Sequence, residues 1–361
     1  MPSLDIRKVR LQNQHLLQAT ITDPVDVLKA LVAIQAQDYY GAKWALAQRT
    51  VNCTDATVEK AFTDGRILRL HVMRPTWHFV TPADIRWLVK LTAPRVNAVS
   101  SYYYRKAELD HHVFKRTNKA LIKALQGGRQ LTRDELRLAV KRTGIEPGDS
   151  MRFGYIMHRA ELDGIVCSGG RRENQFTYAL VDERVTHSRT LDADEALGEL
   201  TERYFKSRAP ATIHDYVWWS GLTASQAKRG IEIVGSALRS EILDGQKYWL
   251  SARTQRSIKD SPRRVHLLPA YDEYFIAYKD RSAAMHPSID QKRIAPKLIF
   301  DTPLVIDGQA CGGWKRVVQK DAVTVSVTPF KPLNRTDRGA VNSACADYAL
   351  FIGKEAQVEY L

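Results

Sequence analysis

The 361-residue chain is predicted to adopt an α+β fold, with three tandem winged-helix (helix-turn-helix) modules followed by a C-terminal, mostly β region. Two observations lead to this prediction. A pattern of helices, a turn, another helix and a short two-stranded ribbon recurs three times, which is the element order of a helix-turn-helix module with a wing. After Arg263, short strand-like runs are separated by Gly, Pro and Asp, which is typical of β structure. The predicted boundaries are 1–105, 106–190, 191–262 and 263–361.

The first module contains an apolar helix near the N-terminus. Asp23 is placed to cap this helix and Pro24 to occupy its first position, a favoured combination at a helix start. Apolar residues spaced by three and four, from Val27 to Ile34, indicate one buried face. We expect the helix to end in the segment Gln35-Ala36-Gln37-Asp38.

The other two modules are marked by capping boxes, in which a Ser or Thr and a polar side chain three residues later satisfy backbone groups at a helix start. The second module has Thr132-x-x-Glu135, and the third has Thr212-x-x-Asp215 and Thr223-x-x-Gln226 on the two sides of Gly221. Residues 213–238 are therefore predicted to form a helix-turn-helix. In the C-terminal region, strands are expected at 265–268, 304–306, 322–327 and 357–360.

The charge balance is strongly basic. Lys and Arg outnumber Asp and Glu by 54 to 40, which gives a formal net charge of +14. Residues 105–172 hold 15 basic and 8 acidic side chains, and residues 251–338 hold 16 and 9, so these two segments supply the entire excess. Positive charge concentrated in segments favours a polyanionic partner, because counterions are released at phosphates. A solvated basic surface is the alternative interpretation.

Cysteine usage and hydropathy indicate a soluble protein of the cytosol. Cys53, Cys167, Cys311 and Cys345 are far apart and lack a CxxC spacing, so reduced thiols and no metal site are expected. No apolar run reaches the roughly 18 residues of a membrane span, and no signal peptide is evident. Neither a P-loop nor a GxGxxG motif indicates a cofactor.

Gln35 and Gln37 are the residues that point to a chemistry. A glutamine side chain donates and accepts hydrogen bonds but cannot act as a general base, so two of them can orient a water molecule. Oriented water suffices where the leaving group is already good, as in an N7-alkylated guanine that departs with its positive charge. Residues two apart on an ideal helix point about 200° apart, so the pair must lie where the helix ends. The alternative is that Gln35 is a buried residue bonded to backbone.

Four motifs in fixed order resemble a known family. They are Gln35-Ala36-Gln37 with its preceding helix, Met73-Arg74-Pro75-Thr76-Trp77-His78, the segment Asp215-Tyr-Val-Trp-Trp-Ser-Gly-Leu-Thr223, and Leu267-Leu-Pro-Ala-Tyr-Asp-Glu-Tyr274 with Tyr278-Lys-Asp-Arg281. With these motifs the sequence resembles the bacterial winged-helix DNA glycosylases of the AlkZ-like family, which the azinomycin-resistance glycosylase typifies.

The resemblance implies a concave DNA-binding surface made by three winged helices. It also implies monofunctional removal of N7-alkylated purines and, in some members, unhooking of interstrand crosslinks. Gln35 and Gln37 correspond to the catalytic glutamines of the family. Related members carry aspartate at the second position, and here Asp38 follows Gln37 directly, so Asp38 is a third catalytic candidate. We therefore expect alkylated double-stranded DNA as partner, no cofactor, no metal, a monomer and a location in the bacterial cytosol.

Four further residues are candidate DNA contacts. Residues 67–80 are predicted to form two strands that turn near Arg74 and Pro75, and Arg74 and His78 on this hairpin are candidates for contacting phosphate or the exposed sugar. Arg171 and Arg172 follow Gly169-Gly170 in a predicted glycine turn of the second wing, where glycine permits close approach to phosphate. A structural histidine and a solvated turn are the respective alternatives.

Two other functions compete with the glycosylase. A non-catalytic winged-helix DNA-binding protein or transcriptional regulator accounts for the modules and the charge, but such regulators usually dimerise on symmetric half-sites and no dimerisation helix is evident. A protein-interaction scaffold with degenerate winged helices is the third interpretation. Substituting Gln35 separates the catalytic interpretation from the other two, because only the catalytic one predicts loss of base excision with DNA affinity retained.

Overall fold

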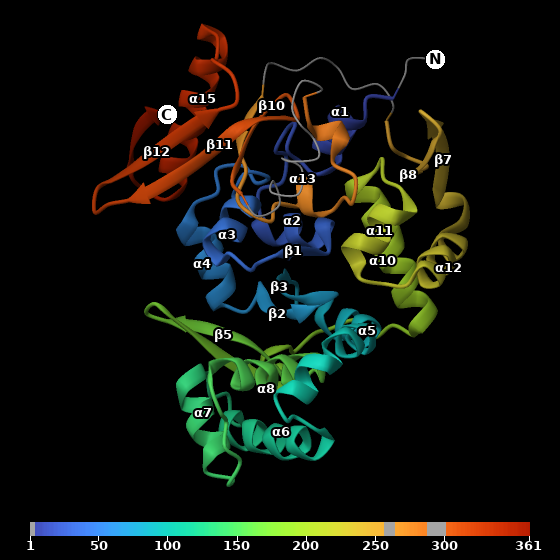
Figure 1. Ribbon diagram of the computed structural model, residues 1–361, viewed down its shortest axis with the longest axis vertical. Coiled ribbons are helices and arrows are strands. Elements are labelled where there is room, and N and C mark those ends of the chain that lie inside the picture. The colour runs from blue at the N-terminus through green and yellow to red at the C-terminus, as the bar shows by residue number, and fades with distance from the viewer. Residues whose placement is uncertain (1–3, 256–263, 287–300) are drawn as a thin grey trace. The chain divides into compact units, whose positions relative to one another are not determined.

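The computed structural model describes residues 4–255, 264–286 and 301–361, which form two compact units of mixed α+β structure (Figure 1). Each unit is assembled from separate stretches of the chain. Unit 1 consists of Met1–Glu59, Gly198–Trp219 and Ala224–Leu361. Unit 2 consists of Lys60–Leu197 and Ser220–Thr223. Part of the first predicted module thus falls in unit 2, and the division into four segments stays a prediction.

The N-terminal stretch of unit 1 is mainly helical. Asp23 caps its second helix by accepting a hydrogen bond from the Val25 N–H at 2.9 Å, and Pro24 is the first helical residue, as the sequence predicts. The helix ends at Leu31 because Val32, with φ of +66°, lies outside the helical region of backbone space. The elements of this stretch are α1 (Ile6–Asn13), α2 (Pro24–Leu31), β1 (Ala33–Gln35), α3 (Tyr39–Ala47) and α4 (Asp55–Thr63), which runs on into unit 2.

The middle of the chain returns to unit 1 at Gly198 with a helix-turn-helix, whose turn at Ser220–Thr223 is assigned to unit 2, and with a hairpin that follows it. The predicted capping box at Thr212 is present, since the Asp215 carboxylate accepts from the Thr212 N–H and the Thr212 hydroxyl accepts from the Asp215 N–H. The second helix stops at Val234, earlier than expected, because a 3-10 turn at Gly235 leads directly into a strand. The elements are α10 (Ala193–Arg208), α11 (Ile213–Ser220), α12 (Ala224–Val234), η1 (Gly235–Ala237), β7 (Leu238–Leu243) and β8 (Gln246–Ser251).

The C-terminal part of unit 1 is a five-stranded sheet with the order β13-β12-β11-β10-β9. The four expected strands are present, and β12 and β13 pair in parallel whereas the other neighbours are antiparallel. The longest strand, β11, was not predicted; it contains Gly312, where an added Cβ would lie 2.5 Å from the Thr328 carbonyl oxygen. The elements are β9 (Val265–Leu267), α13 (Glu273–Ile276), η2 (Ser282–Ala284), β10 (Pro303–Ile306), β11 (Gln309–Val318), β12 (Ala322–Pro329), α15 (Arg335–Phe351) and β13 (Glu355–Tyr360).

Unit 2 begins with a hairpin and a 22-residue helix, after which a helix, a short strand, two helices and a second hairpin follow in order. Its three-stranded sheet has the order β4-β6-β5, so the short strand β4 lies at the edge beside the last strand of the hairpin. The elements are β2 (Leu68–Val72), β3 (Arg74–Val80), α5 (Ile85–Lys106), α6 (His111–Leu125), β4 (Leu131–Thr132), α7 (Arg133–Lys141), α8 (Ser150–Leu162), β5 (Val166–Arg172), β6 (Gln175–Leu180) and α9 (Val181–Arg184).

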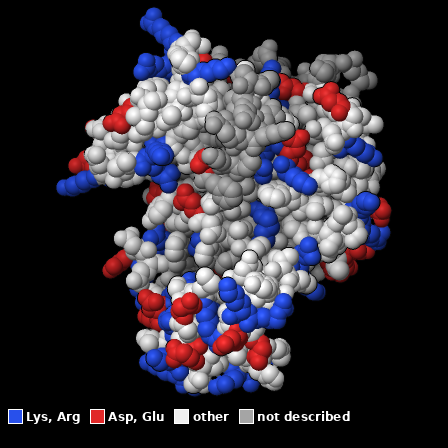
Figure 2. Space-filling view, in the orientation of Figure 1, with Lys and Arg blue, Asp and Glu red and all other residues white. Residues whose placement is uncertain are grey.

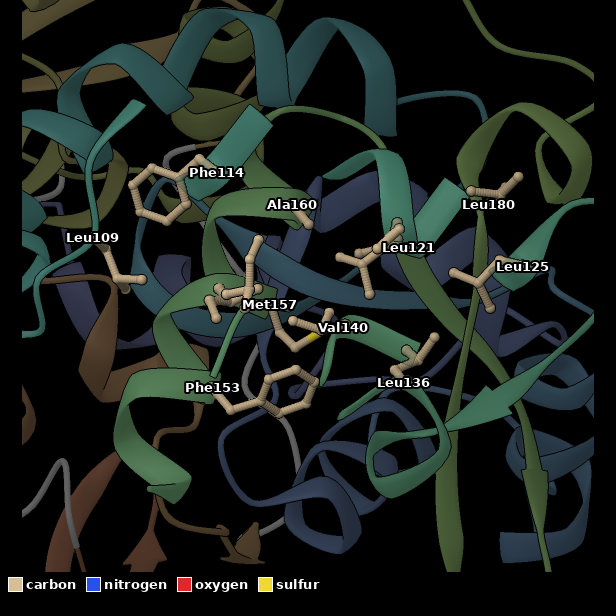
Figure 3. Close-up of a cluster of buried hydrophobic side chains, with 14 of the residues drawn as sticks. Leu109, Phe114, Leu121, Leu125, Leu136, Val140, Phe153, Met157, Ala160 and Leu180 are labelled. Carbon is tan, nitrogen blue, oxygen red and sulfur yellow. The ribbon is translucent and has the colours of Figure 1, made fainter. Parts of the chain in front are cut away.

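The core of unit 2 lies between α6, α7 and α8 (Figure 3). Phe114 and Leu121 on α6 meet Leu136 on α7 and Phe153 on α8, and all four side chains are buried. The predicted capping box starts α7, with Thr132 and Glu135 each bonded to the other's backbone N–H. The outer face of α6 is basic, with Lys115, Arg116, Lys119 and Lys123 exposed.

Acidic side chains accompany the basic ones on the surface of unit 2. Figure 2 shows Lys and Arg (blue) mixed with Asp and Glu (red) over the helices of this unit. The basic excess of residues 105–172 is therefore distributed among carboxylates on this face. Among the described helices, none combines the length and the apolar character needed to cross a membrane.

The second hairpin of unit 2 differs from its prediction. Gly169 and Gly170 lie within β5, and the turn falls at residues 173–174, so the expectation of a glycine turn is wrong. The register shifts between Ser168 and Arg171, which places the two glycines at a bulge. There the Thr177 hydroxyl on β6 donates to the Gly170 carbonyl. A Cβ added at Gly169 would lie 2.3 Å from the Thr177 hydroxyl oxygen, so glycine is required there for this close approach between strands.

We expect Gly169→Ala to lower the free energy of unfolding by about 1–3 kcal/mol, because the new Cβ would lie 2.3 Å from the Thr177 hydroxyl oxygen. Gly339→Ala is the matched control. No atom lies within 4 Å of a Cβ added at Gly339 in α15, so the same substitution there is expected to raise stability by up to about 1 kcal/mol. Urea denaturation measures both changes, and similar values for the two variants would contradict this account of the bulge.

Candidate active site

The Gln35–Asp38 segment lies in unit 1 between a strand and a helix. Gln35 is the last residue of β1, Gln37 occupies a bend, and Asp38 caps α3. The expectation that the glutamines lie at the end of α2 is wrong, because that helix stops at Leu31. Gln37 lies two residues beyond Gln35, in the bend after the strand, so helical spacing does not set the directions of the two side chains. Gln35 is buried, with 5% of its surface exposed, whereas Gln37 is exposed to solvent.

The backbone of β1 is held by two charged side chains. The Glu273 carboxylate accepts a hydrogen bond from the Gln35 N–H at 3.2 Å, and the Arg208 guanidinium donates to the Ala33 carbonyl at 3.1 Å. Glu273 and Arg208 are themselves paired at 2.6 Å with both side chains fully buried. Trp219 is a third partner of the Glu273 carboxylate and donates its indole N–H at 2.8 Å. We call Glu273, Arg208 and Trp219 the β1 clamp.

A second buried ion pair lies next to the clamp in sequence. Asp272 receives two hydrogen bonds from Arg49, at 2.8 and 2.9 Å, and neither side chain is exposed. Gln14 links the two pairs, since its side-chain oxygen accepts from Arg49 and its amide donates to the Glu273 carbonyl. The Asp272 carboxylate also accepts the Tyr274 N–H at 2.8 Å, so it is engaged in structural contacts.

Asp38 has two structural contacts. Its carboxylate accepts the Gly41 N–H at 3.0 Å, which caps α3, and lies 3.8 Å from the Arg316 guanidinium on β11. A Cβ at position 41 would lie 2.6 Å from one carboxylate oxygen of Asp38, so only glycine leaves room for this cap. Asp38 is nevertheless about a third exposed, and it adjoins the exposed Gln37.

The hairpin candidates Arg74 and His78 lie in unit 2. His78 is completely buried, its Nδ1 lies 2.9 Å from the Thr76 carbonyl, and its Nε2 lies 3.4 Å from the Arg74 guanidinium. Because the carbonyl only accepts, Nδ1 donates and Nε2 accepts from Arg74. His78 thereby orients Arg74, which is the more exposed of the two, and a DNA contact by either residue stays a prediction. The chain turns at Met73, one residue before the expected position.

The wing candidates have protein partners. Arg172 pairs with the capping-box carboxylate of Glu135 at 2.9 Å and donates to the Gln130 carbonyl. Arg171 lies over the Phe176 ring, 5.2 Å from its centroid. Arg172 is half exposed, so its charge faces solvent even while it is paired. Phosphate binding by these arginines stays a prediction.

The comparisons with known proteins agree with one another. A family model described as "DNA glycosylase AlkZ-like" matches residues 28–351. The chain belongs to the AlkZ-like DNA glycosylase family. It is 23% identical over 352 residues to the "Interstrand DNA cross-link repair glycosylase" of Streptomyces sahachiroi, with 94% of each chain covered. The solved structure of Streptomyces sahachiroi DNA glycosylase AlkZ shares the fold, with a TM-score of 0.82, 21% identity and full coverage of both chains.

Membership of the AlkZ-like family makes this protein a DNA glycosylase by class and DNA its substrate. Sequence reasoning did not identify the β1 clamp. Glu273 and Trp219 lie in motifs that carry the family resemblance, but no pattern in the sequence pairs Arg208 with Glu273 across 65 positions. The contacts of these three residues with one another and with the backbone of β1 join distant parts of the chain, so they are seen only in the folded structure.

Replacing Glu273 with alanine is expected to cost about 3–5 kcal/mol of unfolding free energy, because Arg208 would remain buried without its counter-charge. Asp182→Ala serves as the control, since its pair with Arg86 lies at the surface and is worth less than about 1 kcal/mol. Denaturant titrations of the two variants measure the difference. A Glu273→Ala cost no larger than that of Asp182→Ala would contradict the clamp.

Proposed function

We propose that this protein is a monofunctional DNA glycosylase that hydrolyses the N-glycosidic bond of N7-alkylated purines in double-stranded DNA. Water is the nucleophile, and Gln35 and Gln37 position it. The observation that carries the proposal is the fixed backbone of β1, bonded to Arg208 at Ala33 and to Glu273 at Gln35. A side chain whose task is orientation needs such a rigid support, because small misplacements of reacting groups are costly.

The chemistry suits residues that cannot hold a proton. Alkylation at N7 gives the purine a positive charge, so the base leaves without protonation and an oxocarbenium-like sugar forms. Water held by the glutamine amides then adds to the sugar and loses its proton late. The Asp38 carboxylate is the acidic group within the motif segment, and we assign it the stabilisation of the cationic sugar or the acceptance of this proton.

The helical modules are proposed to bind the DNA. In unit 2 the order α6, β4, α7, α8, β5, β6 and the sheet order β4-β6-β5 fit a winged helix. In unit 1 the succession α11, α12, β7, β8 fits a second module of this type. Exposed Lys115, Arg116, Lys119 and Lys123 on α6 add phosphate-binding candidates that the sequence reasoning did not single out.

The first test is single-turnover release of base from duplex DNA that carries one N7-methylguanine. We expect Gln37→Ala to slow release by about 100-fold or more, because the water loses its orientation. Duplex affinity is expected to stay nearly unchanged. Gln319→Ala changes an exposed glutamine between β11 and β12, outside the proposed DNA-binding modules; it is the control and is expected to retain the wild-type rate.

Wild-type protein that binds duplex DNA but releases neither N7-methylguanine nor a bulky N7 adduct or N7-linked crosslink would overturn the proposal in favour of a non-catalytic DNA-binding protein. Release confined to the bulky or crosslinked substrates would assign those lesions instead. The curated relative is named for interstrand cross-link repair, so a crosslinked duplex belongs in the substrate panel.

The Asp38→Asn variant tests the negative charge of Asp38 separately from its role as the cap of α3. Asparagine caps helices about as well as aspartate, so the Gly41 hydrogen bond and the folded state are expected to persist. If the carboxylate acts on the sugar, base release is expected to fall by about 100-fold with the melting temperature unchanged. An unchanged rate would limit Asp38 to capping α3, and Asp38→Ala, which removes the cap as well, measures that contribution.

A further inference from the structure

Unit 2 contains a cavity that the proposed chemistry of the Gln35–Asp38 segment does not use. Its volume is about 780 Å³, which is in the range of small-molecule sites. The β2–β3 hairpin contributes Trp77, α5 contributes Tyr103, and α8 contributes Tyr155. Three buried titratable side chains also line it: His71, His158 and Glu161. We call this space the unit 2 cavity.

Glu161 and His71 form a close pair at the cavity. One carboxylate oxygen, Oε2, accepts both the His71 backbone N–H at 2.7 Å and the ring Nδ1–H at 2.5 Å. Within the described residues, the other carboxylate oxygen has no hydrogen bond. Glu161 is 1% exposed, and its other carboxylate oxygen remains available as a hydrogen-bond acceptor.

His158 supplies a second acceptor. The Tyr104 hydroxyl donates to the Asn97 side chain at 3.1 Å and lies 2.8 Å from His158 Nδ1, so Nδ1 carries the proton and donates to Tyr104. His158 Nε2 is therefore a lone-pair acceptor, and it has no partner among the described residues. Burial, aided by nearby His71 and Arg159, lowers the pKa of His158 to about 3, which keeps the ring neutral at physiological pH.

The outer part of the cavity is aromatic. Tyr103 and Tyr155 lie nearly parallel, with ring centroids 6.0 Å apart and an interplanar angle of 21°. Trp77 packs beside His71 with ring centroids 4.5 Å apart. Aromatic rings of this kind stack on flat heteroaromatic ligands, and each stacked base is worth about a tenfold or greater gain in affinity.

We propose that the unit 2 cavity binds an aminopurine base, which stacks on Tyr103 and Tyr155 and donates its amino hydrogens toward Glu161 and His158. A flat ring matches the aromatic outer part, and amino donors match the two unsatisfied acceptors, which a purely apolar ligand would leave unpaired. The base comes either free in solution or as part of a single strand. This binding does not depend on the proposed hydrolysis, so its failure and the failure of base excision are separate results.

The test uses 2-aminopurine, whose fluorescence is quenched by stacking. The full-length protein is titrated with the free base and with a single-stranded oligonucleotide that contains one 2-aminopurine. We expect saturable quenching with at least one of the two forms, and the form that binds identifies the source of the base. Tyr103→Ala is expected to raise the Kd about tenfold.

Tyr102→Ala is the matched control. Tyr102 is the neighbouring tyrosine on α5, 60% exposed against 51% for Tyr103, and it does not line the cavity. Its Kd is expected to equal that of the wild type. The acceptors are tested by competition, in which 2,6-diaminopurine should displace the probe at lower concentration than unsubstituted purine. Equal Kd values for the two tyrosine variants, equal competition by the two purines, or no saturable binding of either probe would overturn the proposal.

Discussion

Two neighbouring carboxylates, Asp272 and Glu273, carry their charge into the interior of unit 1, and each is matched there by an arginine from a distant part of the chain. Removing charges from water costs several kcal/mol per ion, so the arrangement is stable only when every donor and acceptor is used. Arg49 and Arg208 supply paired hydrogen bonds, and Gln14 and Trp219 complete the network. The positions of β1, α13 and the end of α10 depend on this constraint.

In the candidate active site, this network holds the backbone of the segment that carries Gln35 and Gln37. β1 has only three residues, too few to hold a fixed geometry by themselves, and the clamp bonds its backbone at both Ala33 and Gln35. Asp38 caps the next helix, which fixes the other end of the segment. Gln37 is thus an exposed side chain on a backbone held from both sides. That combination suits a residue that must orient water for a substrate arriving from solvent.

Unit 2 contains the helices and strands that we propose form a winged-helix module. In a winged helix the third helix enters the groove, and here α8 occupies that place in the element order. One side of α8 is covered by α5, to which it is joined by the bond between Tyr104 and His158. The unit 2 cavity opens beside this contact, between the hairpin, α5 and α8. α8 therefore lines the unit 2 cavity and, in the proposed winged helix, is also the helix expected to contact DNA.

The sequence by itself determined the features that depend on neighbours in the chain. The caps at Asp23, Thr132 and Thr212 follow from side chains two or three residues from the groups they bond, and the family follows from short motifs. Tertiary structure decided the rest. Gly312 did not indicate β11 because the close approach of β12, which requires a glycine there, is seen only in the fold. The glutamine segment begins in a strand whose backbone is bonded to Glu273, 238 positions away. Contacts between residues far apart in the chain depend on buried charges and close packing in the folded protein. Patterns of neighbouring residues in the sequence do not contain that information.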